Sequence, residues 1–340
     1  MKYCGLDLGK KSSRFCIVDS KRKTVEEGTV RNTSENLIET FGRLESMRIV
    51  IEASGKAFWV ADILETCGHI PIVVDPGRTK AIGAAKIKHD KLDARVLAQL
   101  CAADILAPVD RPDESQRYRR MPVTARGGLV RCRTILINQV RGMLDSEGII
   151  LKPCRTEVFV DRVTDIVDDI PKEMFFAIEP VLNAIDTLTE EIDACGQKLE
   201  ASVAEDNEAK LVMTAPGVGP IVAACFLAAV RDASRFKSGR QLAAYLGLVP
   251  SLYQSGNACR LGRITKHGNK QARWALCIAA NSLLSARTKK ESALRSWGLK
   301  LVERTGKKKA VIAVARKLAS VLWSMLRNNK PFEPRLSASA

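Results

Sequence analysis

The stretch KYCGLDLGKKSSRFCIVDSKRKTVEEGTV (residues 2–30) decides the fold class, because it carries three strand-like patterns in quick succession. Apolar runs at Tyr3–Leu8 and Arg14–Val18 are followed, after the basic turn Ser20–Lys23, by a third run at Val25–Val30. Three strands with such short connections predict an antiparallel meander at the start of the chain.

Helical and strand patterns alternate after the meander. An RNase H-like α/β fold has the order three strands, helix, strand, helix, strand, helix, whereas a doubly wound nucleotide-binding domain lacks the opening meander. We therefore predict an RNase H-like domain over residues 1–110. Its later elements are expected to be a helix capped by Thr33 or Ser34 and ending near Leu44, a strand at Arg48–Ile51, a helix at Phe58–Thr66, a strand at Ile70–Val74 and a helix at about His89–Ala103.

Residues 111–205 are expected to form an antiparallel helical pair of coiled-coil type, with a structural or oligomeric role. Two sets of apolar residues recur there at helical spacing, and Gly148, Pro153 and Pro171 separate them. Pro122 and the pair Gly127–Gly128 are unusual for a continuous helix. The two sets are Ile135, Leu136, Val140, Met143 and Leu144, and Val181, Leu182, Ile185, Leu188 and Ile192.

Residues 206–332 are expected to form a third, mainly helical domain, followed by a disordered tail at 333–340. The segment Pro250–Asn257 is rich in Ser, Gly and Asn and is expected to be a loop. The expected helices include Gly239–Leu246, Asn269–Ala286 and Lys308–Arg327.

Composition narrows the class of protein. The chain has no apolar run of about 18 residues, so we expect no membrane-spanning helix. Its start lacks the apolar region of a signal peptide, and a cytoplasmic location is expected. The 10 cysteines are scattered without a C-x-x-C pair, and the three histidines form no H-x-x-x-H pattern, which disfavours a disulfide framework and a zinc site.

The net charge of +16 is concentrated near the C-terminus. Residues 259–330 contain 18 Lys and Arg but only two acids, Glu291 and Glu303, while the rest of the chain is balanced at 36 basic and 36 acidic residues. Such clustering is typical of a polyanion partner, and in the cytoplasm that partner is expected to be a nucleic acid. The alternative is a basic surface that is merely solvated.

Four acids in the first domain could form one site. Asp7 is central in the first strand, where an acid is costly without a partner, and Glu52 ends a later strand. Asp90 and Asp93 are spaced i, i+3 and share one helix face. Clustered carboxylates remain ionised together only when cations neutralise them, and their hard oxygens select Mg²⁺ or Mn²⁺.

Each of these acids has an alternative role when it is considered alone. Asp7 could belong to the phosphate loop of an actin-like ATPase, although a second D-x-G at a later glycine-rich turn is missing. Glu52 could cap a helix. Asp90 and Asp93 could be solvated, because KHDKLDAR carries its own counter-charges.

Two features of the last domain could contact a phosphate backbone. APGVGPIVA (215–223) has the form of a helix-hairpin-helix turn, in which Gly217 and Gly219 let the backbone approach a phosphate; an ordinary connection between two helices has the same pattern. The segment that contains Ser251 and Ser255 is followed by a basic series, Arg260, Arg263, Lys266, Lys270 and Arg273. From the residues alone, Ser255-Gly256 is a turn signal.

Several of these motifs resemble the DEDD transposases of bacterial insertion sequences, in the family named after insertion sequence 110. The resemblance spans most of the chain outside the central helices, and RYRRMPVTARGGLVRCRTILINQVRGML (117–144) is similar more loosely to the family's linking helices. The motifs are GLDLGK, IEASG and KHDKLDARVLAQL in the first domain, and APGVGP, FKSGRQLAAYLGLVP and QSGNACRLGRITKHGNKQARWAL in the last.

The resemblance implies a composite site in a RuvC-like protein that cuts and rejoins DNA. Asp7, Glu52, Asp90 and Asp93 would bind Mg²⁺ or Mn²⁺ near the scissile phosphate, and Ser255, in preference to Ser251, would form a phosphoserine link to DNA. The family implies dimers that join into tetramers, and a structured guide RNA from the element that pairs with donor and target DNA. Such a protein would act at the bacterial nucleoid.

Two other functions are compatible with the residues. A metal-dependent nuclease of the junction-resolvase type would need the four acids alone and would leave hydrolysed ends. A non-catalytic nucleic-acid-binding protein would retain the basic region while its acids had lost their role.

Overall fold

The computed structural model describes residues 1–334 except 78, 80–89, 256–257, 287 and 289–290, and within this range the side chains of 90–93, 254, 255, 258 and 259 are not described. The chain divides into two compact units, Met1–Asp113 and Glu114–Ala340. Each unit is built around its own hydrophobic clusters.

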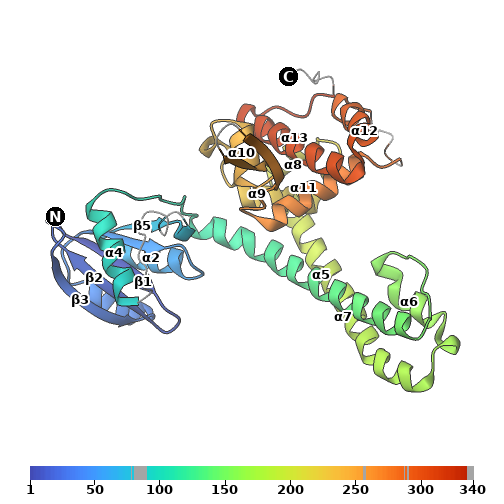
Figure 1. The fold of residues 1–340 in the computed structure, drawn as a ribbon, viewed down its shortest axis with the longest axis horizontal. Helices are drawn as coiled ribbons and strands as arrows, with labels where there is room; N and C mark the ends of the chain where they lie inside the picture. Colours follow the sequence, from blue (N-terminus) through green and yellow to red (C-terminus); the bar gives the residue numbers. More distant parts are fainter. Residues whose placement is uncertain (78, 80–89, 256–257, 287, 289–290, 335–340) are drawn as a thin grey trace. The chain divides into compact units, whose positions relative to one another are not determined.

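The first unit contains a five-stranded sheet in the order β3-β2-β1-β4-β5 (Figure 1). The first three strands pair antiparallel, which confirms the predicted meander, and β4 and β5 run parallel to β1. The strands are β1 Tyr3–Leu8, β2 Ser12–Val18, β3 Thr24–Arg31, β4 Arg48–Glu52 and β5 Ile70–Val74.

Helices cover both faces of this sheet. Helix α1 (Ser34–Phe41), whose first turn is capped by the Thr33 side chain, and α2 (Ala57–Thr66) pack on one face over Leu6, Ile49 and Ile51. Helix α4 (Asp90–Ala102) packs on the other face against Cys16, Val18, Val50 and Val74. The buried apolar residues of β1 and β4 therefore alternate between two cores, as a sheet covered on both sides requires.

Two long helices, α5 (Glu114–Ser146) and α7 (Lys172–Ala204), dominate the start of the second unit and lie side by side (Figure 1). They are antiparallel, because Leu144 near the end of α5 packs with Ile178 near the start of α7. Helix α5 continues through Pro122, which costs it a single N–H donor on an exposed stretch. Between the two helices the chain forms η1 (Thr156–Val158), α6 (Phe159–Thr164) and η2 (Val167–Asp169).

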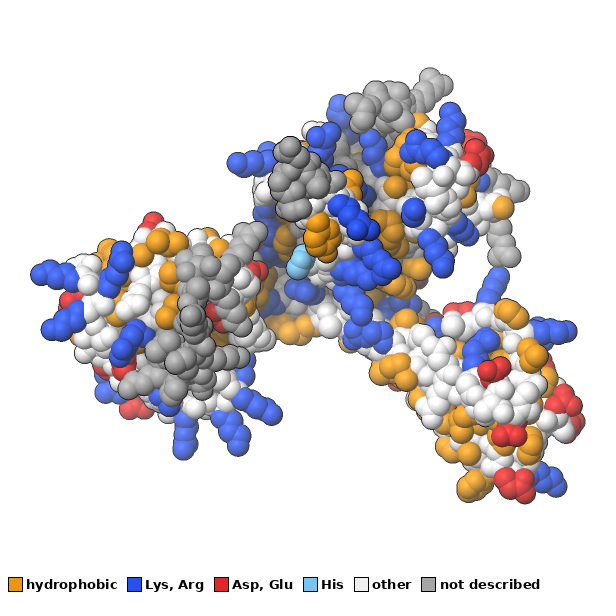
Figure 2. Space-filling model, in the orientation of Figure 1, with side chains coloured by type: hydrophobic (Ala, Val, Ile, Leu, Met, Phe, Trp, Pro, Cys, Tyr) orange, Lys and Arg blue, Asp and Glu red, His pale blue; other side chains and the backbone are white. Residues whose placement is uncertain are grey.

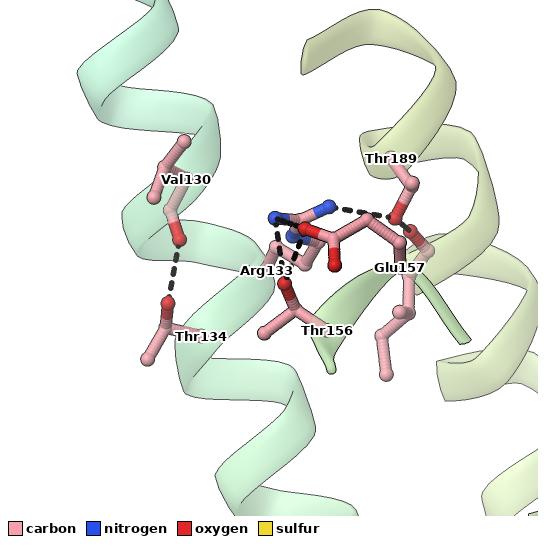
Figure 3. A network of polar contacts seen from close by, with 7 residues as sticks. Val130, Arg133, Thr134, Thr156, Glu157 and Thr189 are labelled. Atoms are coloured by element: carbon pink, nitrogen blue, oxygen red, sulfur yellow. Dashed lines mark hydrogen bonds and ion pairs between the residues drawn. The ribbon is translucent and has the colours of Figure 1, made fainter. Parts of the chain in front are cut away.

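A buried arginine, Arg133, links this helical pair to the connecting segment that contains η1 (Figure 3). The Arg133 guanidinium donates 3.2 Å hydrogen bonds to the hydroxyls of Thr189 on α7 and Thr156 on η1, and its Nη2 lies 3.7 Å from the Glu157 carboxylate. Arg133 is only 7% exposed, so these partners compensate a charge that would otherwise be costly to bury. The contacts hold three elements in one fixed arrangement.

The rest of the second unit is a helical core with one β-hairpin. The expected helices at 239–246, 269–286 and 308–327 are found with small shifts at their ends, and a further helix, α12, was not predicted. The elements are α8 Asn207–Met213, α9 Pro220–Val230, η3 Ala233–Arg235, α10 Gly239–Tyr245, β6 Pro250–Ser255, β7 Ala258–Ile264, α11 Lys270–Leu283, α12 Ala293–Thr305 and α13 Lys307–Asn328.

The prediction of a loop at Pro250–Asn257 was wrong for Pro250–Ser255, while Gly256 and Asn257 lie outside the described residues. Pro250–Ser255 is strand β6, paired antiparallel with β7 from Pro250 and Ile264 to Ser255 and Ala258. In the sequence, only Gly256 and Asn257 stand between the two strands, and a Gly-Asn pair between two strand-like runs is a sequence signal for a hairpin. The strand pattern was missed because the segment is rich in polar residues.

Three other expectations can be set against the structure. None of the described helices combines the length and the apolar character needed to cross a membrane. The described cysteines are free thiols; Cys132 is exposed, and Cys4, Cys16, Cys101 and Cys225 are buried. Of the tail that was expected to be disordered, residues 335–340 lie outside the described residues.

Candidate active site

Asp7 and Glu52 lie at the same edge of the sheet, on neighbouring parallel strands. The pairing of Leu6 with Ile51 places Asp7 beside Glu52, each one residue further along its strand. Side chains alternate along a strand, so both acids belong to the face covered by α4, opposite to Leu6 and Ile51. Both acids are partly buried. The structure thus brings together two of the four acids that the sequence singles out.

Helix α4 crosses β1 at Gly5 and runs in the opposite direction. A Cβ atom added at Gly5 would lie 2.1 Å from the carbonyl oxygen of Ala94, so only glycine allows the two backbones to approach so closely. Further along the helix, Ala102 packs in the same cluster as Tyr3, at the start of β1. The first turn of α4 therefore lies toward the end of β1 that carries Asp7.

Asp90 and Asp93 occupy this first turn, and Asp90 is its first residue. Their side chains lie outside the described residues, so only their backbone positions beside the edge of Asp7 and Glu52 are placed. Among the side chains that are described, no group of three or more His, Cys, Asp or Glu is arranged to hold a metal ion. A site of four acids therefore depends on the two acids of α4.

The loops that follow β1 and β4 are joined at the same edge. Lys56 Nζ donates a hydrogen bond to the carbonyl oxygen of Lys10, and Asn32 Nδ2 donates to that of Gly9 at 2.9 Å.

The carboxylates at this edge are chemically suitable ligands for a divalent metal, because their oxygens are hard ligands. Two carboxylates on one face, with two acids on the adjoining helix turn, fit such an ion.

The contact at Gly5 leads to a first prediction. We expect Gly5→Ala to destabilise the protein by about 1–3 kcal/mol, because the added methyl group must push α4 away from β1. Urea unfolding of the wild-type and Gly5→Ala proteins measures this loss. Gly55→Ala is the unfolding control, because a Cβ atom there meets nothing within 4 Å.

Ser255 is the last residue of β6, at the end of the hairpin in the second unit. Its side chain is not described, but its backbone pairs with Ala258. Ser251, the other serine of the strand, donates its hydroxyl to the carbonyl oxygen of Arg263 at 3.0 Å. The Ser251 hydroxyl therefore has a structural partner across the hairpin.

The hairpin exposes both apolar and basic side chains. Leu252, Tyr253 and Leu261 are 58%, 65% and 66% exposed, and Arg260 and Arg263 are also exposed. Aromatic rings and arginines on one exposed element are typical of surfaces that bind nucleic-acid strands. Sequence reasoning noticed these arginines but overlooked Tyr253, because alternation along a strand was not expected there.

The five basic residues predicted to bind nucleic acid have different surroundings. Lys266 and Lys270 are exposed, like the two arginines of the hairpin. Arg273 is partly buried, and its Nη1 donates to the carbonyl oxygens of Leu246, His267 and Gly268 at 3.1, 2.8 and 3.2 Å. Burial lowers the pKa of this guanidinium. Arg273 thus has a structural role, and its contact with nucleic acid stays a prediction.

The two glycines of the segment between α8 and α9 also differ. Gly217 has φ +81°, and a Cβ atom there would lie 2.5 Å from the carbonyl oxygen of Ala279 on α11, so packing alone requires glycine. Gly219 precedes α9 as its N-cap, and a Cβ atom there would meet nothing within 4 Å. The backbone at Gly219 is therefore the more open to a ligand.

Figure 2 shows many Lys and Arg side chains on the visible face of the C-terminal helical part, as the charge count of residues 259–330 predicts. Acidic side chains are few on the same part of that face. Acids are plentiful instead on the visible surface around α6. Positive charge is therefore concentrated on the helices that also carry the hairpin.

Relatives of known name match the chain over almost its whole length. A "Probable family 20 transposase" of Pseudomonas aeruginosa is 28% identical, over 97% of this chain and 98% of its own. The "Transposase for insertion sequence element IS1111A" of Coxiella burnetii is 28% identical, over 98% of this chain and 91% of its own. A "Pilin gene-inverting protein" of Moraxella lacunata is 25% identical, over 98% of each chain.

Two family models cover the two candidate regions. The model for DEDD transposases of IS110, described as "Transposase", matches residues 4–148, which include all four acids. The model described as "Transposase IS116/IS110/IS902 family" matches residues 209–295, which include the hairpin and the segment before α9. Membership implies an enzyme that cuts and rejoins DNA and depends on a divalent metal. The chain belongs to the IS110 family of insertion-sequence transposases.

Proposed function

We propose that this transposase cuts DNA with an RNase H-like, RuvC-like domain whose metal site is formed by Asp7, Glu52, Asp90 and Asp93. The observation that carries the proposal is the position of Asp7 and Glu52 side by side at one sheet edge, with the first turn of α4 beside them. A strand order of β3-β2-β1-β4-β5, with three antiparallel strands followed by two parallel ones, supports this fold.

The four acids would hold Mg²⁺, or Mn²⁺ in its place. When bound, such ions stabilise the attacking and leaving oxygens of a phosphodiester and the charge that develops between them. The residues of the chain supply the negative charge and the fixed geometry. Lys56 and Lys10, whose contact joins the two loops at this edge, support the positions of the strand ends.

The nucleophile in this proposal is the hydroxyl of Ser255. Its oxygen would attack the phosphorus atom, forming a serine–phosphate bond while the bond to one deoxyribose oxygen breaks. The serine loses a proton and the leaving deoxyribose oxygen gains one; attack by a deoxyribose hydroxyl on the phosphoserine then reverses these changes and rejoins DNA. The exposed arginines of the hairpin would stabilise the extra negative charge of the transition state. The structural role of the Ser251 hydroxyl supports Ser255 as the attacking residue.

The second unit would bind nucleic acid mainly through its backbone. Gly219 and the start of α9, in a helix-hairpin-helix-like segment with Gly217, would approach a phosphate, and Arg260, Arg263 and Lys266 would add charge. Lys270 and Arg273 complete the proposed set. Such contacts position DNA without reading its sequence, which suits a protein that leaves sequence recognition to a guide RNA.

The remaining parts of the proposal concern assembly and organisation. Residues 111–205, which contain α5, α7 and the segment between them, would act as a coiled-coil region. This region would connect a catalytic domain (1–110) to a DNA-binding domain (206–332). The protein would work as a homodimer that joins into a tetramer on donor and target DNA, at the nucleoid.

Recombination of supplied donor and target DNA tests this function. Purified protein is incubated with both DNAs and Mg²⁺, with and without RNA transcribed from the sequence flanking its gene. We expect joined products only when the RNA is present, and none in EDTA. Products that form equally well without RNA would remove the guide from the proposal. Hydrolysed ends without any joining would favour a simple metal nuclease.

A further inference from the structure

A small cavity lies beside β2, the strand that pairs with the strand carrying Asp7. It has a volume of about 160 Å³ and lies between the hairpin of β2 and β3 and the first half of α4. No step of the proposed reaction uses it. Its lining residues are Arg14, Phe15, Glu27, Gly28, Thr29 and Ala94.

The register of the sheet places Arg14 next to the acids. Asp7 pairs with Arg14 across the antiparallel β1–β2 ladder, so the two residues belong to the same face of the sheet. Arg14 in turn pairs with Thr29 on β3, and both are exposed. A row of Glu52, Asp7, Arg14 and Thr29 therefore runs across four strands at one level, on the face covered by α4.

The charges around the cavity leave Arg14 available. Glu27, the acid that lines it, accepts hydrogen bonds from Nε and Nη2 of Arg95 at 3.0 and 2.6 Å. Within the residues that the structure describes, no hydrogen bond or ion pair involves the guanidinium of Arg14. The walls thus combine a guanidinium that makes no ion pair with a described side chain, although Asp7 lies across the ladder from it, with the hydroxyl of Thr29. That combination recognises a phosphate group.

We propose that Arg14 binds a phosphate of the DNA strand held at the acid site, adjacent to the phosphodiester that is cut. This inference rests on the proposed function, since it needs DNA at Asp7 and Glu52. Carboxylates repel a polyanion wherever bound cations do not neutralise them, and Arg14 adds a positive charge on the β2 side of the site. Its planar guanidinium can donate two hydrogen bonds to one phosphate, so it orients the strand and does not merely attract it.

Salt-dependent binding of a labelled DNA duplex tests Arg14 in the full-length protein, with Ca²⁺ replacing Mg²⁺. We expect Arg14→Ala to weaken binding by about 5- to 20-fold and to reduce the slope of log Kd against log salt by about one. Arg14→Lys should restore the slope, but not the full single-turnover cutting rate. The matched control is Lys21→Ala, an exposed cation in the turn after β2, at the opposite end of the sheet; it should bind like wild type.

Each other outcome has a definite meaning. If the slope of log Kd against log salt is the same for Arg14→Ala as for Lys21→Ala, the inference is overturned. So would a loss of thermal stability with unchanged DNA binding, because Arg14 would then serve only as a counter-charge for Asp7. Asp7→Asn separates the two claims. If it still cuts DNA, the proposed function fails, whereas the binding slope of Arg14→Ala still reports on the phosphate contact.

Discussion

Asp7→Asn is expected to reduce DNA cutting by about 10³-fold or more, while the protein stays folded. Asn keeps the size of the side chain but removes the negative charge that holds a divalent ion. Asp7 lies beside Glu52 on the face covered by α4, so Glu52→Gln should have a similar effect. Single-turnover cutting of labelled DNA at several Mg²⁺ concentrations measures both variants.

A matched acid outside the site gives the control for this result. Glu45 is 86% exposed in its side chain and pairs only loosely with Lys2 at 3.6 Å. Glu45→Gln should cut like wild type. Cutting by Asp7→Asn within a few-fold of wild type would contradict a catalytic role for the acids and favour a protein that only binds nucleic acid.

Ser255→Ala is expected to abolish the covalent protein–DNA adduct and to reduce joining by roughly 10⁴-fold or more, because no other group replaces a missing nucleophile. The adduct is measured with labelled DNA after denaturing gel electrophoresis, since a serine–phosphate bond survives detergent. The same variant should still bind DNA, because it retains all the basic residues.

Ser251→Ala is the matched control on the same strand. It loses only the hydrogen bond from its hydroxyl to the carbonyl oxygen of Arg263, which is worth about 1 kcal/mol. It should form the adduct at close to the wild-type level. If the adduct persists in Ser255→Ala and disappears in Ser251→Ala, the nucleophile has been assigned to the wrong serine. Hydrolysed ends at full rate in Ser255→Ala would instead indicate a nuclease that needs the acids alone.

The fold of the first unit could be predicted because its signals are local. The strands Tyr3–Leu8 and Ile70–Val74 have the predicted bounds, and the helix expected at about His89–Ala103 is described over Asp90–Ala102. Short connections made the meander visible, and glycine and proline marked the ends of elements. The proximity of Asp7 to Glu52 could also be predicted from the sequence, because the ends of neighbouring parallel strands meet at one edge of a sheet.

The features of the fold and the site that could not be predicted depend on contacts between residues far apart in the sequence. Gly5 looks unremarkable in sequence, and only the packing of α4 explains it. Arg14 was not a candidate because its position opposite Asp7 depends on the register of the β1–β2 hairpin, although that register could have been tested against the two strand patterns. The hairpin at Pro250–Ile264 was missed because polar residues hid its alternation, and the structural role of Arg273 requires three carbonyl groups that the fold brings together.

The central claim is that Asp7, Glu52, Asp90 and Asp93 form one metal site. Anomalous diffraction from crystals of the full-length protein with DNA and Mn²⁺ tests it most directly. We predict manganese peaks at the sheet edge, with carboxylate oxygens of both strand acids and of the α4 acids about 2 Å away. Manganese bound elsewhere, or coordinated by Asp7 and Glu52 without either acid of α4, would contradict the claim.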